Sequence, residues 1–191
     1  HESLDPFGPA AFAVSWAGET RSANWFDTAR ELTERWHHQQ QIRLATARPG
    51  MMDPEVHHPV LDCFVRGLPH LFQVVEAGAG TVVAVEITGE SGGEWAVHLG
   101  EVGWRLGICG GESAAARVTI PESIAWRLFT KGIERAAALG QVRIEGDRRL
   151  GERVLSLTAI VAWASDNAKP AELSTTGRPA SAILKELAYP Q

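Results

Sequence analysis

The spacing of apolar residues changes near Thr81, and this change constrains the fold more than any other feature of the sequence. Before Thr81, apolar residues recur every three or four positions, which is typical of amphipathic helices. After it, Val83, Val85 and Ile87 lie in an extended run, which is typical of a β-strand. A helical first part followed by a strand-rich part predicts an α+β fold.

Two helices are predicted before this change. Residues 1–20 are punctuated by Pro and Gly and are expected to be irregular. Ser22 is a suitable N-cap for a helix that continues to about residue 48, where a Pro-Gly pair stops it. A second helix is expected over residues 54–75, with a kink or break at Pro69.

Four strands are predicted to follow, and their order suggests a meander. They cover residues 81–87, 94–99, 104–108 and 116–120. Glycine-rich segments at 89–93 and 107–111 lack the Lys-Ser/Thr of a phosphate-binding loop, and neither opens a helix directly. Both are therefore interpreted as hairpin turns.

The remainder of the chain is expected to add a helix, a short strand and a tail. The helix runs from Pro121 to about residue 139, where Gly140 caps it, and the strand covers residues 142–145. Residues 154–163 can be helix or strand by periodicity alone. The polar residues 165–191 are expected to form a flexible tail.

Composition excludes several classes of function. The 191 residues carry 18 Lys and Arg against 23 Asp and Glu, and no run of Lys and Arg, so the sequence gives no electrostatic signal for binding the nucleic-acid backbone. No run approaches the roughly 18 apolar residues of a membrane span, and the first twenty residues lack a basic start followed by an apolar run. We therefore expect a cytoplasmic protein without nucleic-acid or membrane partners. Cys63 and Cys109 are too few for a disulfide framework and are expected to act as small hydrophobes.

Glu34 and His38 are the first candidates for chemistry. They lie four residues apart in the first predicted helix, so one face can present both to a single metal ion. The alternative is that this side is the solvated face of an amphipathic helix, because a largely apolar stripe lies almost opposite. That stripe consists of Trp25, Ala29, Leu32 and Trp36, whereas Asp27, Glu31 and Gln41 accompany the Glu34 side. Catalytic zinc usually has three protein ligands, so a third must come from elsewhere.

The other histidines are weaker candidates for that third ligand. His57 and His58 begin the second predicted helix and are typical of a pair exposed to water. His70 and His98 have no carboxylate or cysteine at ligand spacing. His37 points about 100 degrees away from its neighbour in a regular helix, so the two cannot serve one ion.

Residues 34–43 (ERWHHQQQIR) resemble the mycothiol-dependent maleylpyruvate isomerase family, which belongs to the DinB-like superfamily. The similarity extends over about residues 16–162. The later half is similar to the sterol-carrier-protein fold, a curved sheet with helices that can enclose an apolar cavity. The supporting segments are HPVLD at 58–62, LPH at 68–70, Gly92-Gly93-x-Trp95, WRLF at 126–129 and Gly146-Asp147.

The resemblance implies a metal site and a thiol cofactor. The family carries Glu-x-x-x-His in the last helix of a four-helix bundle, and a His from an earlier helix completes a divalent metal site, commonly zinc. By this resemblance Glu34 and His38 are metal ligands, and the metal activates a low-molecular-weight thiol such as mycothiol for an isomerase or S-transferase reaction on a small organic substrate.

The resemblance also implies that part of the bundle is missing. Only 33 residues precede Glu34, whereas the preceding helices need on the order of 100 residues. The expected domains are therefore the end of a DinB-like helical domain (1–53), a sterol-carrier-like domain with a mainly antiparallel sheet (54–164) and the tail (165–191). A helix without its bundle partners exposes its apolar stripe, so a homodimer is also expected.

A non-catalytic function is the alternative hypothesis. In this interpretation residues 54–164 bind an apolar ligand or a partner, and the first helix is a remnant. Trp95, Trp104 and Trp126 can line an apolar cavity or fill the core, and core filling is the favoured interpretation.

Overall fold

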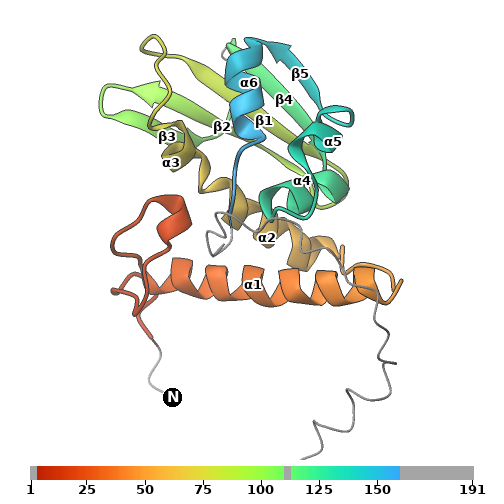
Figure 1. Cartoon of the computed structure of the whole chain (residues 1–191). Helices are drawn as coiled ribbons and strands as arrows, with labels where there is room; N and C mark the ends of the chain where they lie inside the picture. Colours follow the sequence, from red (N-terminus) through yellow and green to blue (C-terminus); the bar gives the residue numbers. More distant parts are fainter. Residues whose placement is uncertain (1–3, 110–112, 160–191) are drawn as a thin grey trace, which may run out of the picture. The chain divides into compact units, whose positions relative to one another are not determined.

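The computed structural model describes residues 4–109 and 113–159. The chain divides into two units, 1–161 and 162–191, and all described residues belong to the first. In this unit a long helix, α1 (Asn24–Ala45), lies against α2 (Pro54–Val65), on the side of α2 away from a five-stranded sheet (Figure 1). The predicted α+β class is confirmed.

The first predicted helix is confirmed, but its N-cap is not Ser22. The N-terminal segment has one short 3-10 turn, η1 (Ser15–Ala17), and α1 then begins after Ala23, whose side chain makes no capping bond. The Ser22 hydroxyl accepts a hydrogen bond from the Val14 N–H (2.8 Å) and contacts Glu19 instead. Ser22 therefore ties the N-terminal segment together rather than starting the helix.

The second predicted helix is two helices, α2 and α3 (Leu68–Phe72), and the break lies at residues 66–67. Pro69 falls in the first turn of α3, where a missing N–H and a fixed φ cost little. The predicted break is therefore present, but it lies just before Pro69 and not at this proline. Asp53 caps α2 by accepting the N–H of Glu55 at 3.0 Å.

The predicted strands are present, but the predicted meander is wrong. The strands are β1 (Val82–Thr88), β2 (Gly93–Gly100), β3 (Gly103–Gly107), β4 (Ala116–Pro121) and β5 (Arg143–Gly146), in the order β3-β2-β1-β4-β5. Only the β1–β4 pair is parallel, so the sheet is mainly antiparallel, as predicted. The predicted hairpin between β3 and β4 is therefore wrong, since these two strands are not neighbours in the sheet, and residues 110–111 of the predicted turn lie outside the described residues.

The parallel pairing has a physical reason in the register of β1 and β4. Val85 lies opposite Val118, and Ile87 lies opposite Ile120. All four side chains are buried in the main core cluster, so this pairing places the apolar residues of β4 beside those of the central strand. The turn at 89–93 does join β1 and β2 as a hairpin, as predicted.

Three helices follow β4, where one was predicted. They are α4 (Glu122–Phe129), α5 (Arg135–Leu139) and α6 (Arg148–Val154). The break between α4 and α5 contains Gly132 and Lys131, which has a positive φ of 58°. Residues 155–159 are neither helix nor strand. Residues 160–163 and the predicted tail at 165–191 lie outside the described part of the chain.

The main core lies between the sheet and the helices that cover one of its faces. Trp95, Trp104 and Trp126 are buried in it, which confirms that they fill the core. Cys63 is buried as expected for a small hydrophobe, and burial raises the pKa of its thiol to about 12. Among the described residues, no helix has the length and apolar character needed to span a membrane.

Candidate functional site

The structure brings Glu34 and His38 together on one side of α1. His38 Nε2 lies 3.9 Å from Glu34 Oε2, and the His38 side chain is 68% exposed. On the other side of the ring, His38 Nδ1 lies 3.2 Å from Gln41 Oε1. When Nδ1–H donates to this oxygen, Nε2 carries the lone pair and faces the Glu34 carboxylate, as in many metal-ligating histidines.

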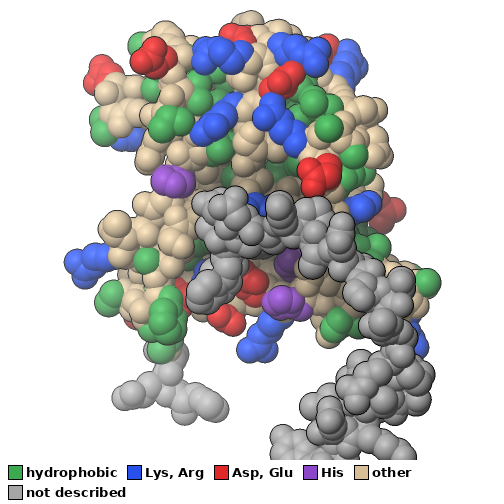
Figure 2. Space-filling view, in the orientation of Figure 1, with side chains coloured by type: hydrophobic (Ala, Val, Ile, Leu, Met, Phe, Trp, Pro, Cys, Tyr) green, Lys and Arg blue, Asp and Glu red, His purple; other side chains and the backbone are tan. Residues whose placement is uncertain are grey.

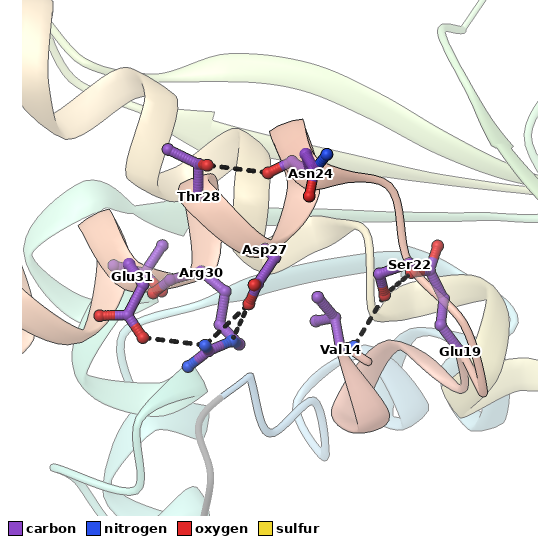
Figure 3. A network of polar contacts seen from close by, with 9 residues as sticks. Val14, Glu19, Ser22, Asn24, Asp27, Thr28, Arg30 and Glu31 are labelled. Atoms are coloured by element: carbon purple, nitrogen blue, oxygen red, sulfur yellow. Dashed lines mark hydrogen bonds and ion pairs between the residues drawn. The ribbon is translucent and has the colours of Figure 1, made fainter. Parts of the chain in front are cut away.

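The described residues do not complete this pair as a metal site. Within residues 4–109 and 113–159, no three His, Cys, Asp or Glu side chains lie close enough to hold one ion. The nearby carboxylates of Asp27 and Glu31 instead accept hydrogen bonds from Arg30, each at 2.8 Å (Figure 3). An imidazole and a carboxylate suit a divalent metal, but two donors leave the set one short of a usual zinc site.

Three of the other histidines make local contacts elsewhere. His58 Nδ1 lies 3.0 Å from the Ser91 carbonyl in the β1–β2 turn. His98 Nε2 lies 3.1 Å from the Ile108 carbonyl, and His70 is exposed on α3. None of them supplies a third ligand to the pair on α1.

The buried face of α1 differs from the predicted apolar stripe. Trp36 is buried as expected, but Trp25 and Leu32 are 38% and 41% exposed. Polar side chains are buried in their place. Thr33 donates to the Arg30 carbonyl at 2.7 Å, and Gln40 donates to the Met51 carbonyl at 2.9 Å. The buried residues of α1 are Phe26, Thr33, Trp36, His37 and Gln40.

His57 is the main correction among the predicted site residues, because it is fully buried rather than exposed. Its ring stacks on Trp36 with centroids 4.8 Å apart, and neither ring nitrogen has a hydrogen-bond partner among the described residues. Its Nδ1 lies 4.0 Å from Glu122 Oε2. Burial lowers the pKa of His57 to about 4, against the attraction of Glu122.

A sequence signal for this burial was present. His57 precedes Leu61 and Phe64 by four and seven residues, so it lies on the apolar face of α2. Glu122 approaches from the start of α4 and accepts the Ser91 N–H at 2.8 Å. These contacts join residues that are far apart in the sequence, and helical periodicity alone does not reveal them.

An apolar hollow of about 360 Å³ lies between the N-terminal segment and α1. Phe12, Ala13 and Trp16 form its apolar walls, and Ser15 and Arg30 complete the lining. The sequence does not predict this hollow, because residues 1–20 are punctuated by Pro and Gly and carry no clear helical or strand period. The short apolar stretch from Phe12 to Trp16 is the available signal.

Ring packing and polar contacts hold the walls of this hollow in place. Trp16 packs edge-on against Phe26 of α1, with centroids 5.9 Å apart. The Ser22 hydroxyl accepts a hydrogen bond from the N–H of Val14, which lies two residues before Trp16 (Figure 3). Asp27 and Glu31 hold Arg30 from the helix side, so the hollow has a preformed shape and a neutralised cation.

Comparisons with known proteins give a limited result. No protein-family model matches the chain, and no curated protein matches it. Similar solved structures include a sterol carrier protein 2-like 2 from Aedes aegypti, with 18% identity and a TM-score of 0.38 over 50% of this chain and 93% of that one. Sterol carrier protein 2 from Yarrowia lipolytica has 9% identity and a TM-score of 0.32 over 71% and 86%. A ubiquinone synthesis protein, UbiJ-SCP2, has 16% identity and a TM-score of 0.34 over 47% and 88%.

Proposed function

We propose that this chain is a non-catalytic module that binds a small apolar molecule. The observation that carries the proposal is the hollow of about 360 Å³ beside Phe12 and Trp16. Its volume lies within the roughly 300–1,000 Å³ of small-molecule sites, which are usually apolar with a few polar groups. The tryptophans of the sheet fill the core, so the hollow beside α1 is the better candidate for the ligand.

The charges at the hollow favour a neutral ligand. Arg30 is the cation of the lining, and it is paired with both Asp27 and Glu31. An anionic ligand would have to compete with two carboxylates that are already in place. The Phe12 side chain is 68% exposed, so a bound apolar molecule would remove much of its surface from water.

A fluorescence titration of the full chain with N-phenyl-1-naphthylamine, a neutral apolar probe, tests this function. We expect saturable binding that weakens about tenfold in Phe12→Ala, since a partly buried aromatic ring contributes about 1.4 kcal/mol. Val102→Ala truncates an apolar side chain in the β2–β3 turn that is also exposed, at 82%, and is the matched control. Unchanged affinity in Phe12→Ala, or no saturable binding by the unmodified chain, would contradict the proposal.

We propose metal-dependent use of a thiol as a second candidate function. The specific observation that favours it is the Glu34–His38 pair, with Gln41 orienting the imidazole. These two side chains would hold a divalent ion, probed here as zinc, with water or a histidine from outside the described residues as further ligands. Such an ion lowers the pKa of a bound thiol, and mycothiol acting on a small organic substrate is the chemistry that the family resemblance suggests.

Metal content separates this candidate from the first. After equilibration with zinc and removal of the free ion, elemental analysis should find about one zinc per chain, lost in His38→Ala. His70→Ala removes an exposed histidine from another helix and should keep the metal. Equal metal content in the two variants would exclude the Glu34–His38 site.

A further inference from the structure

A second hollow, of about 450 Å³, lies at α5 and α6 and carries a concentration of positive charge. We call it the arginine hollow. Figure 2 shows Lys and Arg side chains gathered on this face of the molecule, over α6. Four guanidinium groups and one carboxylate give the hollow a formal charge of +3, whereas the whole chain has a net charge of −5. Its lining consists of Arg135, Arg148, Arg149, Glu152, Arg153 and Ser156.

Two of these arginines are held in place without being neutralised. Arg149 donates to the Glu76 carbonyl at 3.1 Å. Arg153 donates twice to the Leu71 carbonyl, at 3.1 and 2.8 Å. A backbone carbonyl has no net charge, and neither arginine forms an ion pair with a carboxylate in the part of the chain that the structure describes. Both guanidinium groups are therefore fixed and retain their full positive charge.

The other two arginines share a single carboxylate. Arg148 Nε lies 2.6 Å from one oxygen of Glu152, and Arg135 Nη2 lies 3.1 Å from the other. The hydrogen bond from Arg148 is the main reason why the pKa of Glu152 is lowered, so this carboxylate is ionised at neutral pH. Arg135 also donates to the Ser156 hydroxyl at 3.3 Å, which leaves the hydroxyl proton available to an acceptor.

We propose that the arginine hollow binds a phosphate group carried by a small molecule. Four like charges around one hollow repel each other, and an anion between them removes that repulsion. The planar guanidinium matches phosphate oxygens with two parallel hydrogen bonds, which favours phosphate over a simple counterion. A volume of about 450 Å³ exceeds one phosphate group, so a diphosphate or a phosphate ester fits. This site is separate from the apolar hollow and extends the function beyond it.

Isothermal titration calorimetry of the full chain with pyrophosphate at low salt tests the proposal. We expect saturable binding, weakened about tenfold or more in Arg148→Gln/Arg149→Gln, because each change removes a charge-assisted contact. Arg143→Gln is the matched control. It removes one positive charge from β5, where Arg143 pairs with Glu145 outside the hollow, and should leave the affinity within about twofold.

A second experiment tests whether the phosphate group belongs to a soluble molecule or to a lipid headgroup. Vesicles of phosphatidylcholine with and without phosphatidylglycerol are tested with the same three proteins. Binding of pyrophosphate that depends on Arg148 and Arg149 supports the site with a soluble ligand. Binding only to phosphatidylglycerol vesicles, with the same dependence, supports it with a lipid headgroup. Binding to neither, or an equal loss in Arg143→Gln, would overturn the proposal.

Discussion

The core around the sheet and the interface between α1 and α2 are stabilised by different chemistry. The sheet core is filled by fully buried apolar side chains, such as Phe64, Phe72 and Phe129. Around the α1–α2 interface, buried polar residues accompany Trp36: Thr33, His37 and Gln40 of α1 and His57 of α2. The first region depends on apolar area and shape, whereas the second depends on hydrogen bonds and protonation. Mutations and pH should therefore affect the two regions differently.

The largest effect is expected in the sheet core. Phe129→Ala removes a fully buried ring that packs edge-on against Phe64, with centroids 6.4 Å apart. We expect the free energy of unfolding to fall by about 3–5 kcal/mol, because the transfer energy of the ring and the cavity add. Urea denaturation followed by circular dichroism measures this. Val102→Ala on the surface is the control and should change the value by less than about 0.5 kcal/mol.

The second-largest effect should be a loss of folding stability in acid, and it should originate at the α1–α2 interface. The unfolded chain protonates His57 near pH 6.5, but burial lowers the pKa to about 4 in the folded state. The unfolded state therefore binds more protons between these values, and stability falls as pH decreases through this range. Among the charged groups near His57, Glu122 opposes this shift and His58 adds to it. The expected loss between pH 7 and pH 5 is on the order of 2 kcal/mol.

Urea denaturation at a series of pH values tests this origin of the acid sensitivity. His57→Phe keeps a ring stacked on Trp36 and should reduce the pH dependence. Some dependence of the same sign should remain, because burial also lowers the pKa of His37. His70→Gln removes an exposed histidine and should leave the dependence unchanged. An identical pH profile in His57→Phe and the unmodified chain would contradict the assignment.

The sequence predicts the sheet core better than the arrangement of its strands. The apolar run that contains Val83, Val85 and Ile87 identifies the central strand, whose residues 82–85 are all buried. The parallel pairing of β4 with β1 is not predicted, because its register depends on contacts between residues more than 30 positions apart. The helix α6, which Asp147 caps, is not predicted, because its seven residues are too few to show a helical period.

The candidate sites show the same limit. The i, i+4 spacing of Glu34 and His38 predicts their proximity, which the structure confirms, because one helix determines it. The metal and the thiol remain predictions. His57, Phe12 and the arginine hollow are not predicted, because each depends on several elements or on an irregular segment. Arg149, for example, is held by Glu76, which is 73 residues earlier in the sequence.

A smaller effect should show that the α1–α2 interface depends on hydrogen bonds. Gln40 donates to the Met51 carbonyl at 2.9 Å and accepts the Met51 N–H at 3.3 Å. Gln40→Leu keeps the volume but leaves the Met51 N–H without its partner, while the carbonyl keeps the bond from Trp36 Nε1 at 2.9 Å. We therefore expect a loss of about 1–2 kcal/mol. Faster hydrogen exchange of the Met51 amide should accompany it. A stabilised variant would show that apolar area, and not polar pairing, determines this interface too.

The smallest effect is expected on the outer side of α1. Ile42 is 56% exposed, so Ile42→Gln should change the free energy of unfolding by less than about 0.5 kcal/mol at low protein concentration. The same substitution also tests the predicted homodimer. If another copy of the chain covers Ile42, this residue stabilises the dimer and not the monomer. Sedimentation equilibrium should then show weaker self-association in Ile42→Gln than in the matched variant Val102→Gln. Equal association of the two variants would place any dimer contact away from Ile42.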